Sequence, residues 1–191
     1  MSTASTIKMT ARQFLLLGED PPGVRLELAD GEIAVSPSPI PEHSYVVGAL
    51  HLMLAQHIKS HRLGELYMDV DTIVGVHIVR RPDILFFSTE RLHFIGAKAM
   101  EGPPDLCVEV ISPSSEQVDR DDKFSEYEDF EVPNYWIVDP AVRTFEAFQR
   151  RRKKYTPVVR GQGGDIVHAP PFPELAIPLG ELWRPSSRRR Q

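Results

Sequence analysis

The stretch LCVEVISPS at residues 106–114 places a single carboxylate, Glu109, inside a run of apolar side chains. This run is short, it follows the prolines at 103 and 104, and Ser-Pro-Ser ends it, which is the pattern of a buried β-strand. A carboxylate buried among Val and Ile side chains is costly unless a partner compensates its charge. The strand therefore predicts a buried site at Glu109, where a divalent cation would supply that compensation.

A second acid, Asp83, opens another apolar stretch, ILFF at residues 84–87. Two carboxylates on neighbouring strands can hold an oxygen-preferring ion such as Mg²⁺ and leave positions for water and phosphate oxygens. Lys123 follows, and its ammonium suits the negative charge that develops in phosphodiester hydrolysis. Each residue also has a structural interpretation, because Asp83 could cap a turn after Pro82 and Lys123 could simply pair with Asp119.

Helices and strands alternate along the chain before a strand-rich C-terminal third. We expect a short helix from Thr10 to Leu17, a hairpin at Asp30-Gly31, a long helix at 41–61, two or three strands at 64–87 and a short helix or turn at 90–97. A helix from Ser114 or Ser115 to about residue 130, strands at 135–139, 144–149 and 155–158, and a loop at 161–164 complete the prediction. Asp119, Lys123 and Tyr127 are four residues apart and share one face of their helix.

Length and composition favour one globular domain at residues 1–185, followed by a basic tail at 186–191 that we expect to be disordered. The single cysteine, Cys107, lies between apolar residues and is expected to be a buried hydrophobe. No apolar run approaches the length of a membrane span, so we expect a soluble, cytoplasmic protein. A net charge of −5 argues against general coating of nucleic acid, although basic residues cluster at 150–154, where a hairpin turn is the simpler interpretation.

An ordered series of short motifs extends the analysis from about Arg25 to about Phe148. The series is LEL at 26–28, DGE at 30–32, SP at 36–37 with His43, RPD at 81–83, PDL at 104–106, EVISPS at 109–114, DR at 119–120 with Lys123, and PNYWIVDP at 133–140. In this order it resembles the Uma-two family of putative restriction endonucleases, within the PD-(D/E)XK nuclease superfamily. The resemblance implies an α/β (α+β), restriction endonuclease-like fold, with a central mixed β-sheet flanked by helices. It also implies hydrolysis of DNA phosphodiester bonds with Mg²⁺ or Mn²⁺.

The resemblance also implies roles for individual residues. Asp83, Glu109 and the backbone carbonyl of Val110 would hold the metal ion. The lysine that the superfamily carries two residues after the second acid is absent, because position 111 is Ile, and Lys123 is implied to take its place. Glu27 is implied to be a further catalytic acid, as an extra ligand or water orienter. His43 also matches a family position. A Glu in an amphipathic strand and a His near a helix start both usually face water.

Two other functional classes remain open from the sequence. A protein with this fold could bind nucleic acid or a protein partner while cleaving weakly or not at all. A small metal-dependent hydrolase would use the same carboxylates in an enclosed pocket in place of an open basic groove. For a nuclease, DNA is the expected partner, with a possible homodimer to supply two centres. His57 and His61 have the spacing of metal ligands but lack a zinc motif, and we interpret them as surface residues.

Overall fold

A six-stranded mixed sheet forms the centre of the computed structural model, which describes residues 8–113 and 115–185. Its strands, in spatial order, are β10 (Lys154–Gln162), β9 (Thr144–Arg151), β8 (Asn134–Asp139), β7 (Leu106–Val110), β6 (Ile84–Ser88) and β3 (Gly64–Tyr67). β7 and β8 are parallel, and every other neighbouring pair is antiparallel. The predicted central mixed sheet is therefore confirmed, whereas the tail at 186–191 lies outside the described residues.

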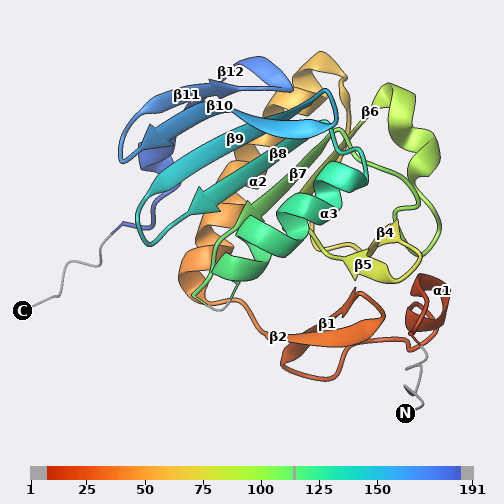
Figure 1. The fold of residues 1–191 in the computed structure, drawn as a ribbon. Coiled ribbons are helices and arrows are strands. Elements are labelled where there is room, and N and C mark those ends of the chain that lie inside the picture. The colour runs from red at the N-terminus through yellow and green to blue at the C-terminus, as the bar shows by residue number, and fades with distance from the viewer. Residues whose placement is uncertain (1–7, 114, 186–191) are drawn as a thin grey trace, which may run out of the picture.

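Two helices cover the two faces of this sheet, α2 (Pro41–His61) behind it and α3 (Lys123–Asp129) in front in Figure 1. Side chains alternate between the faces along each strand. Val108 and Val110 of β7 join the hydrophobic cluster that contains α2, while Cys107 joins the cluster that contains Tyr127 of α3. Glu109 consequently points to the α3 side of the sheet.

The long helix α2 follows the predicted bounds and is the longest in the described chain, at 21 residues. Pro41 at its first position is pre-set for a helix, and Arg62 ends it in the left-handed conformation at φ 54°. The stripe expected to face the core is buried, and it comprises Val46, Leu50, Leu54 and Ile58. Packing against β6 and β7 therefore fixes the N-terminal end of α2, which carries His43, beside the ends of these strands.

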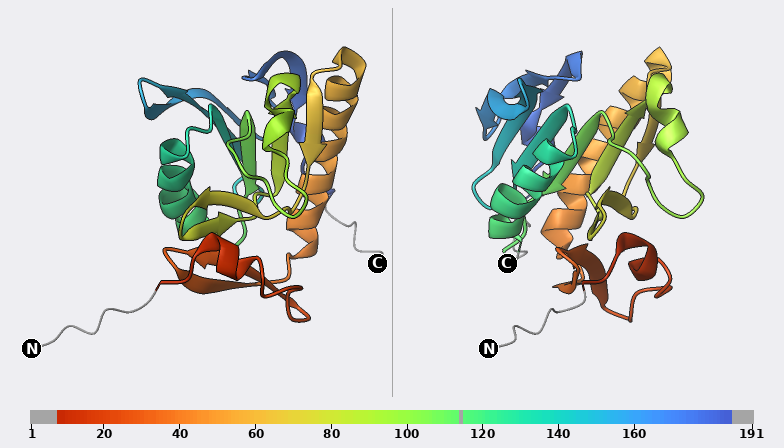
Figure 2. Two further views of the ribbon diagram at one scale, coloured as in Figure 1. Left: turned by 90° about the vertical axis from the view of Figure 1, so that its right-hand side faces the viewer. Right: turned by 45° about the vertical axis from the view of Figure 1, so that its right-hand side comes forward.

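A smaller sheet lies below the central one in Figures 1 and 2. It contains β2 (Glu32–Pro37), β1 (Val24–Ala29), β5 (Ile78–Arg80) and β4 (Thr72–Gly75), in that order. The hairpin of β1 and β2 turns at Asp30 and Gly31, which have φ angles of 48° and 83°, as a tight two-residue turn requires. This sheet carries Glu27 toward the end of β7, and the predicted hairpin is confirmed.

Several predicted boundaries were wrong. The first helix, α1 (Ala11–Phe14), stops before Leu17, although Thr10 caps it as expected. Residues 64–87 hold four strands, not two or three, because two of these short strands belong to the central sheet and two to the smaller sheet. β10 continues through Gly161, which was predicted to be a loop residue, because pairing with β9 overrides its low strand propensity. The last strands, β11 (Ile166–Ala169) and β12 (Phe172–Pro178), were not predicted.

The remaining short elements are helical turns. η1 (Thr89–Phe94) follows β6, and η3 (Leu179–Glu181) follows β12. The basic cluster at 150–154 spans the hairpin turn at residues 152–153 between β9 and β10, as expected. In the part of the chain that the structure describes, no helix is both long and apolar enough to cross a membrane.

The helix that follows β7 departs from the predicted uniform α-helix. A wide π-helical turn, Val118–Asp122, lies within the helical run at residues 116–129, so Lys123 is the first residue of α3 and still lies mid-helix, as predicted. Asp119 within this turn is buried, as is Lys123. Turns of this kind occur frequently at functional sites.

Candidate active site

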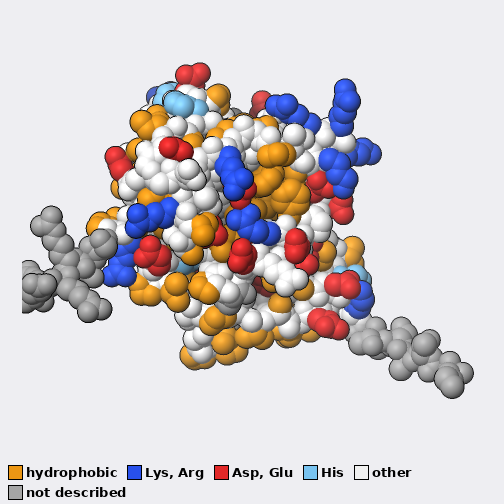
Figure 3. Space-filling view, turned by 60° about the vertical axis from the view of Figure 1, so that its left-hand side comes forward, with side chains coloured by type: hydrophobic (Ala, Val, Ile, Leu, Met, Phe, Trp, Pro, Cys, Tyr) orange, Lys and Arg blue, Asp and Glu red, His pale blue; other side chains and the backbone are white. Residues whose placement is uncertain are grey.

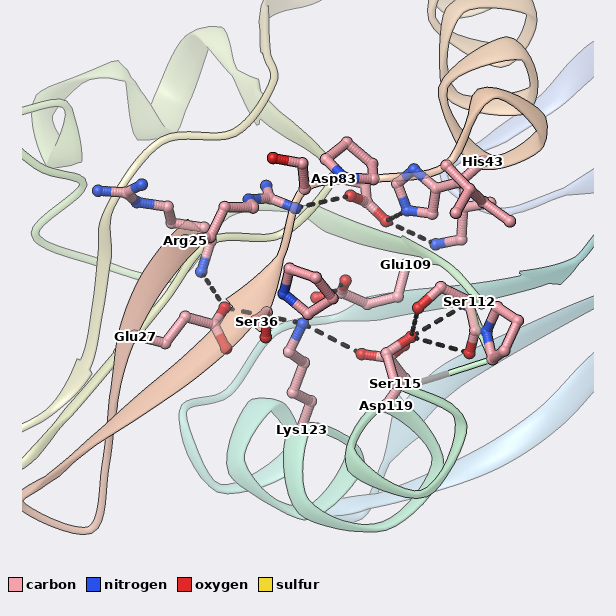
Figure 4. Close-up of a pocket in the computed structure, with 17 residues that line it drawn as sticks. Arg25, Glu27, Ser36, His43, Asp83, Glu109, Ser112, Ser115, Asp119 and Lys123 are labelled. Atoms are coloured by element: carbon pink, nitrogen blue, oxygen red, sulfur yellow. Dashed lines mark hydrogen bonds and ion pairs between the residues drawn. The ribbon is translucent and has the colours of Figure 1, made fainter. Parts of the chain in front are cut away.

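A cavity of about 190 Å³ lies where the C-terminal end of β7 meets the smaller sheet. Side chains from β1, α2, β7, the segment before β6 and the helical turn before α3 line it (Figure 4). All the acidic and basic side chains predicted for the site lie here, and they are Glu27, Asp83, Glu109 and Lys123, with Asp119 beside them. Val110 also lines the cavity. One end of the central sheet therefore brings together residues that are far apart in the sequence.

The strand register explains why Asp83 and Glu109 are neighbours. Ile84 of β6 pairs with Val108 of β7 in an antiparallel register, and one further step places Asp83 opposite Glu109. Directly opposite residues of antiparallel strands point to the same face. Both carboxylates therefore occupy one side of the sheet, as a shared metal site requires.

Asp83 is held through one of its two oxygens. Its Oδ2 accepts a hydrogen bond of 2.8 Å from the backbone N–H of Val110 and lies 3.1 Å from Nε2 of His43. Because a carboxylate only accepts hydrogen bonds, His43 donates through Nε2. Burial opposes the charged form, but His43, Lys123 and the Val110 N–H together keep the pKa of Asp83 below its usual value. The other oxygen, Oδ1, is 3.7 Å from the guanidinium of Arg25.

Glu109 is almost fully buried, with 2% of its surface exposed. Tyr127 donates a hydrogen bond of 2.8 Å to its Oε1, and Nζ of Lys123 lies 3.0 Å from its Oε2. Burial raises the pKa of Glu109 well above its usual value, and the nearby carboxylates of Asp119 and Asp83 add to this effect against the opposing charge of Lys123. The positive charge near Glu109 is therefore too small to offset the cost of burying its ionised form.

Lys123 lies among three carboxylates. Its Nζ is 3.0 Å from Glu109, 3.1 Å from Asp119 and 3.8 Å from Glu27. Burial alone would lower its pKa, but these carboxylates raise the pKa of Lys123 well above its usual value. The expectation that Asp119, Lys123 and Tyr127 share one helix face is confirmed, because Lys123 contacts Asp119 and both Lys123 and Tyr127 contact Glu109.

Glu27 is partly buried beside a partner from the adjacent strand. Arg80 of β5, itself 2% exposed, reaches Glu27 Oε2 at 3.2 Å and binds Glu126 through two nitrogens at 2.6 and 2.7 Å. The backbone N–H of Arg81 donates to Glu27 Oε1 at 2.8 Å. Both oxygens of Glu27 therefore have partners within the protein, and Glu27 contributes negative charge beside Lys123.

Two residues of the cavity gain importance from the structure. His43 is buried against Asp83, although a histidine near a helix start usually faces water. Arg25 was not predicted, yet it lies between Asp69, to which it donates a hydrogen bond, and Asp83. Its position two residues before Glu27 on one strand was a usable signal, because such residues share a face. The rings of His57 and His61 lie against each other in a tilted arrangement in the second half of α2, and neither residue lines the cavity.

The chemistry of the cavity fits a hard divalent cation. Four acidic side chains line the cavity against three basic ones, Arg25, Arg81 and Lys123, so the acids outnumber the cations of the lining. Among residues 8–113 and 115–185, no three Asp, Glu, His or Cys side chains form a group that could hold a metal ion. Magnesium is commonly held by one or two carboxylates with waters completing its shell, so two acids and a backbone carbonyl suffice.

Three comparisons with known proteins place this geometry in context. The model of the Uma2 (Uma-two) family, described as "Putative restriction endonuclease", matches residues 11–180. A comparison with curated proteins finds no match. Among solved structures, the chain resembles a "putative nuclease belonging to DUF820" from Anabaena variabilis, with a TM-score of 0.74 and 21% identity over 91% of this chain and 97% of that one. This likeness shows a shared restriction endonuclease-like fold, and the family match spans most of the sequence. The chain belongs to the Uma2 family of putative restriction endonucleases.

Proposed function

We propose that this protein is a metal-dependent endonuclease that hydrolyses DNA phosphodiester bonds. The observation that carries the proposal is the placement of Asp83 and Glu109 opposite each other on one face of the sheet, with the ammonium of Lys123 beside Glu109. Family membership supports nucleic acid as the substrate. Asp83, Glu109 and the backbone carbonyl of Val110 would hold Mg²⁺ or Mn²⁺, and the ion would polarise the phosphate and lower the pKa of a bound water.

The protein groups around the two acids have distinct tasks in this mechanism. His43 and the Val110 N–H fix Asp83 through Oδ2 and leave Oδ1 directed to the cavity beside Arg25. Tyr127 fixes Glu109 in the same way through Oε1. Preorganised ligands lose little freedom when they bind, which favours a single ligand geometry.

Lys123 supplies positive charge at the position where the reaction develops negative charge. Its ammonium orients the attacking water or stabilises the pentavalent phosphorus, and Asp119 and Glu27 keep the ammonium charged and in place. Glu27 would act as a second catalytic acid through this contact, or as an outer ligand of a second ion. A homodimer would provide two such centres for the two strands of a duplex.

The test is a cleavage assay on several forms of DNA with Mg²⁺, Mn²⁺ or excess chelator. We expect cleavage that requires the divalent ion and that Asp83→Asn and Glu109→Gln abolish. Glu128→Gln is a matched control, because Glu128 is a buried glutamate of α3 that pairs with Lys154 and does not line the cavity. Cleavage that persists in chelator would reject the metal mechanism, whereas metal-independent binding without cleavage would identify a non-catalytic nucleic-acid-binding protein.

A further inference from the structure

We infer that the cavity admits a single DNA strand, as a free end, a flap or an unpaired segment, and not the backbone of an intact duplex. This inference rests on the proposed function and specifies its substrate. It follows from three properties of the cavity, which are the pairing of its cations, the shape of its walls and the apolar character of one side of its mouth.

The cations of the cavity are already engaged by acids. Three basic side chains line it, and each contacts at least two carboxylates. Arg25 contacts Asp69 and Asp83, Arg81 contacts Asp20 and Asp71, and Lys123 contacts Glu109 and Asp119. Three cations against four lining carboxylates leave one net negative charge, with His43 neutral.

This balance is unfavourable for a duplex. Proteins that hold duplex DNA typically neutralise about 6–10 phosphates with Lys and Arg side chains. One bound divalent ion would turn the lining charge to a single positive charge, enough to attract one phosphate group. Figure 3 shows one face of the molecule, with a group of Lys and Arg side chains at its upper right. The other Lys and Arg side chains on this face lie among Asp and Glu side chains and form no continuous basic surface.

The walls of the cavity also select a flexible substrate. Residues 36–40, from the end of β2 to the start of α2, form walls of the cavity together with Ser112, Pro113 and Ser115 from the segment after β7. The two acids lie deep between these walls, with Asp83 only 6% exposed. A duplex is stiff over a length of about 50 nm, and bending it through 40–90° costs about 1–6 kcal/mol, whereas one strand can turn a single phosphate inward by rotating its own bonds.

The mouth of the cavity offers an apolar surface to unstacked bases. Pro37, Pro39 and Ile40 line it, and Ile40 keeps 47% of its surface exposed. The faces of bases are hidden within a duplex and available in a single strand, where apolar and aromatic side chains bind them with little sequence preference. The apolar side of the mouth is therefore useful only to a substrate with unpaired bases.

The experiment compares labelled DNA of one sequence as a circular single strand, a duplex with a single-stranded flap, and a covalently closed circular duplex. We expect the single strand and the flap to be cleaved at least tenfold faster than the closed duplex. Binding is followed by fluorescence anisotropy with Ca²⁺ in place of Mg²⁺. Contact with one or two phosphates predicts a slope of about −0.7 to −1.4 for log K against log salt.

Position 40 provides a matched pair of variants. Ile40 occupies the cap position of α2 without a side-chain cap, so Ile40→Ser and Ile40→Asp should both raise the Tm. Both variants remove the apolar contact and should lower single-strand affinity several-fold, and Ile40→Asp should lower it further by repulsion. Leu52→Asp, at an exposed position of α2 that does not line the cavity, should leave affinity unchanged.

The outcomes separate this inference from the proposed function. Cleavage of the closed duplex at the rate of the single strand, or a salt slope steeper than about −4, overturns the inference and leaves the nuclease intact. Unchanged single-strand affinity in both Ile40 variants also overturns it. Absence of binding and cleavage for every DNA form overturns the proposed function and the inference together. If the inference holds, one centre is sufficient, and the homodimer is not needed for cleavage.

Discussion

Replacement of Lys123 by methionine tests the charge balance of the cavity directly. Methionine is similar in length and cannot carry charge, so Lys123→Met leaves Glu109, Asp119 and Glu27 without the ammonium that they share at 3.0, 3.1 and 3.8 Å. Lys123 is 6% exposed, and water cannot replace its charge. We therefore expect Lys123→Met to destabilise the protein markedly in the absence of metal.

The size of the expected stability loss follows from the cost of removing one partner of a buried ion pair. Removal of one partner typically costs about 3–5 kcal/mol, because the remaining charge stays buried without compensation. For a chain of this length, each kcal/mol corresponds to about 2–4 °C, so the Tm should fall by about 6–20 °C. Burial already raises the pKa of Glu109. If Glu109 becomes protonated in the variant, the fall in Tm should lie near the lower end of this range.

The assay is thermal or urea unfolding at pH 7 in chelator, repeated with Mg²⁺ or Mn²⁺. The divalent ion should recover part of the lost stability, because it supplies positive charge to the same carboxylates. Lys154→Met is the matched control, since Lys154 also pairs with a buried glutamate but is 77% exposed, and little loss is expected there. Equal losses in the two variants would refute the charge argument.

Lys123 variants should also separate turnover from metal binding. Lys123→Ala should abolish cleavage without weakening Mn²⁺ binding, because the ammonium acts on charge that forms during reaction. Lys123→Arg should rescue cleavage poorly, because a planar guanidinium cannot occupy the same buried point among three acids. Full activity of Lys123→Ala would show that Lys123 is structural only.

Four further predictions concern the acids, the cysteine and the oligomeric state. Glu109→Gln should keep or raise the Tm in chelator, since it removes one of four crowded acids, and Mn²⁺ soaked into wild-type crystals should give an anomalous peak within coordination distance of Asp83 and Glu109. Cys107 should react with a thiol reagent only on unfolding in urea, because burial raises the pKa of its thiol and excludes the reagent, and rapid reaction of the native protein would contradict this. Light scattering should give twice the chain mass of 21.6 kDa if the homodimer forms, and a mass near 21.6 kDa at tens of micromolar would count against it.

Local pattern was sufficient for the elements whose signals are confined to neighbouring residues. The helix at 41–61 was predicted to its ends because Pro41 and the apolar stripe act within single turns. The hairpin at Asp30-Gly31 and the buried strand around Glu109 were predicted for the same reason. The division of the strands at 64–87 between two sheets and the pairing of Gly161 depend on distant partners. They were not predictable from local pattern.

The same distinction between local and distant signals applies to the residues of the cavity. The sequence alone identified Glu109 as a costly buried acid, because its apolar neighbours are adjacent in the chain, and motif order related it to Asp83, Lys123 and Glu27. Only the tertiary structure decided that Glu27 is mostly withdrawn from solvent, with 12% of its side chain exposed, since its partner Arg80 comes from the neighbouring strand. The contact of His43 with Asp83 likewise exists because α2 packs behind β6 and β7. Charge compensation and exposure depend on distances between elements, and these distances are set by packing and strand register across the whole fold.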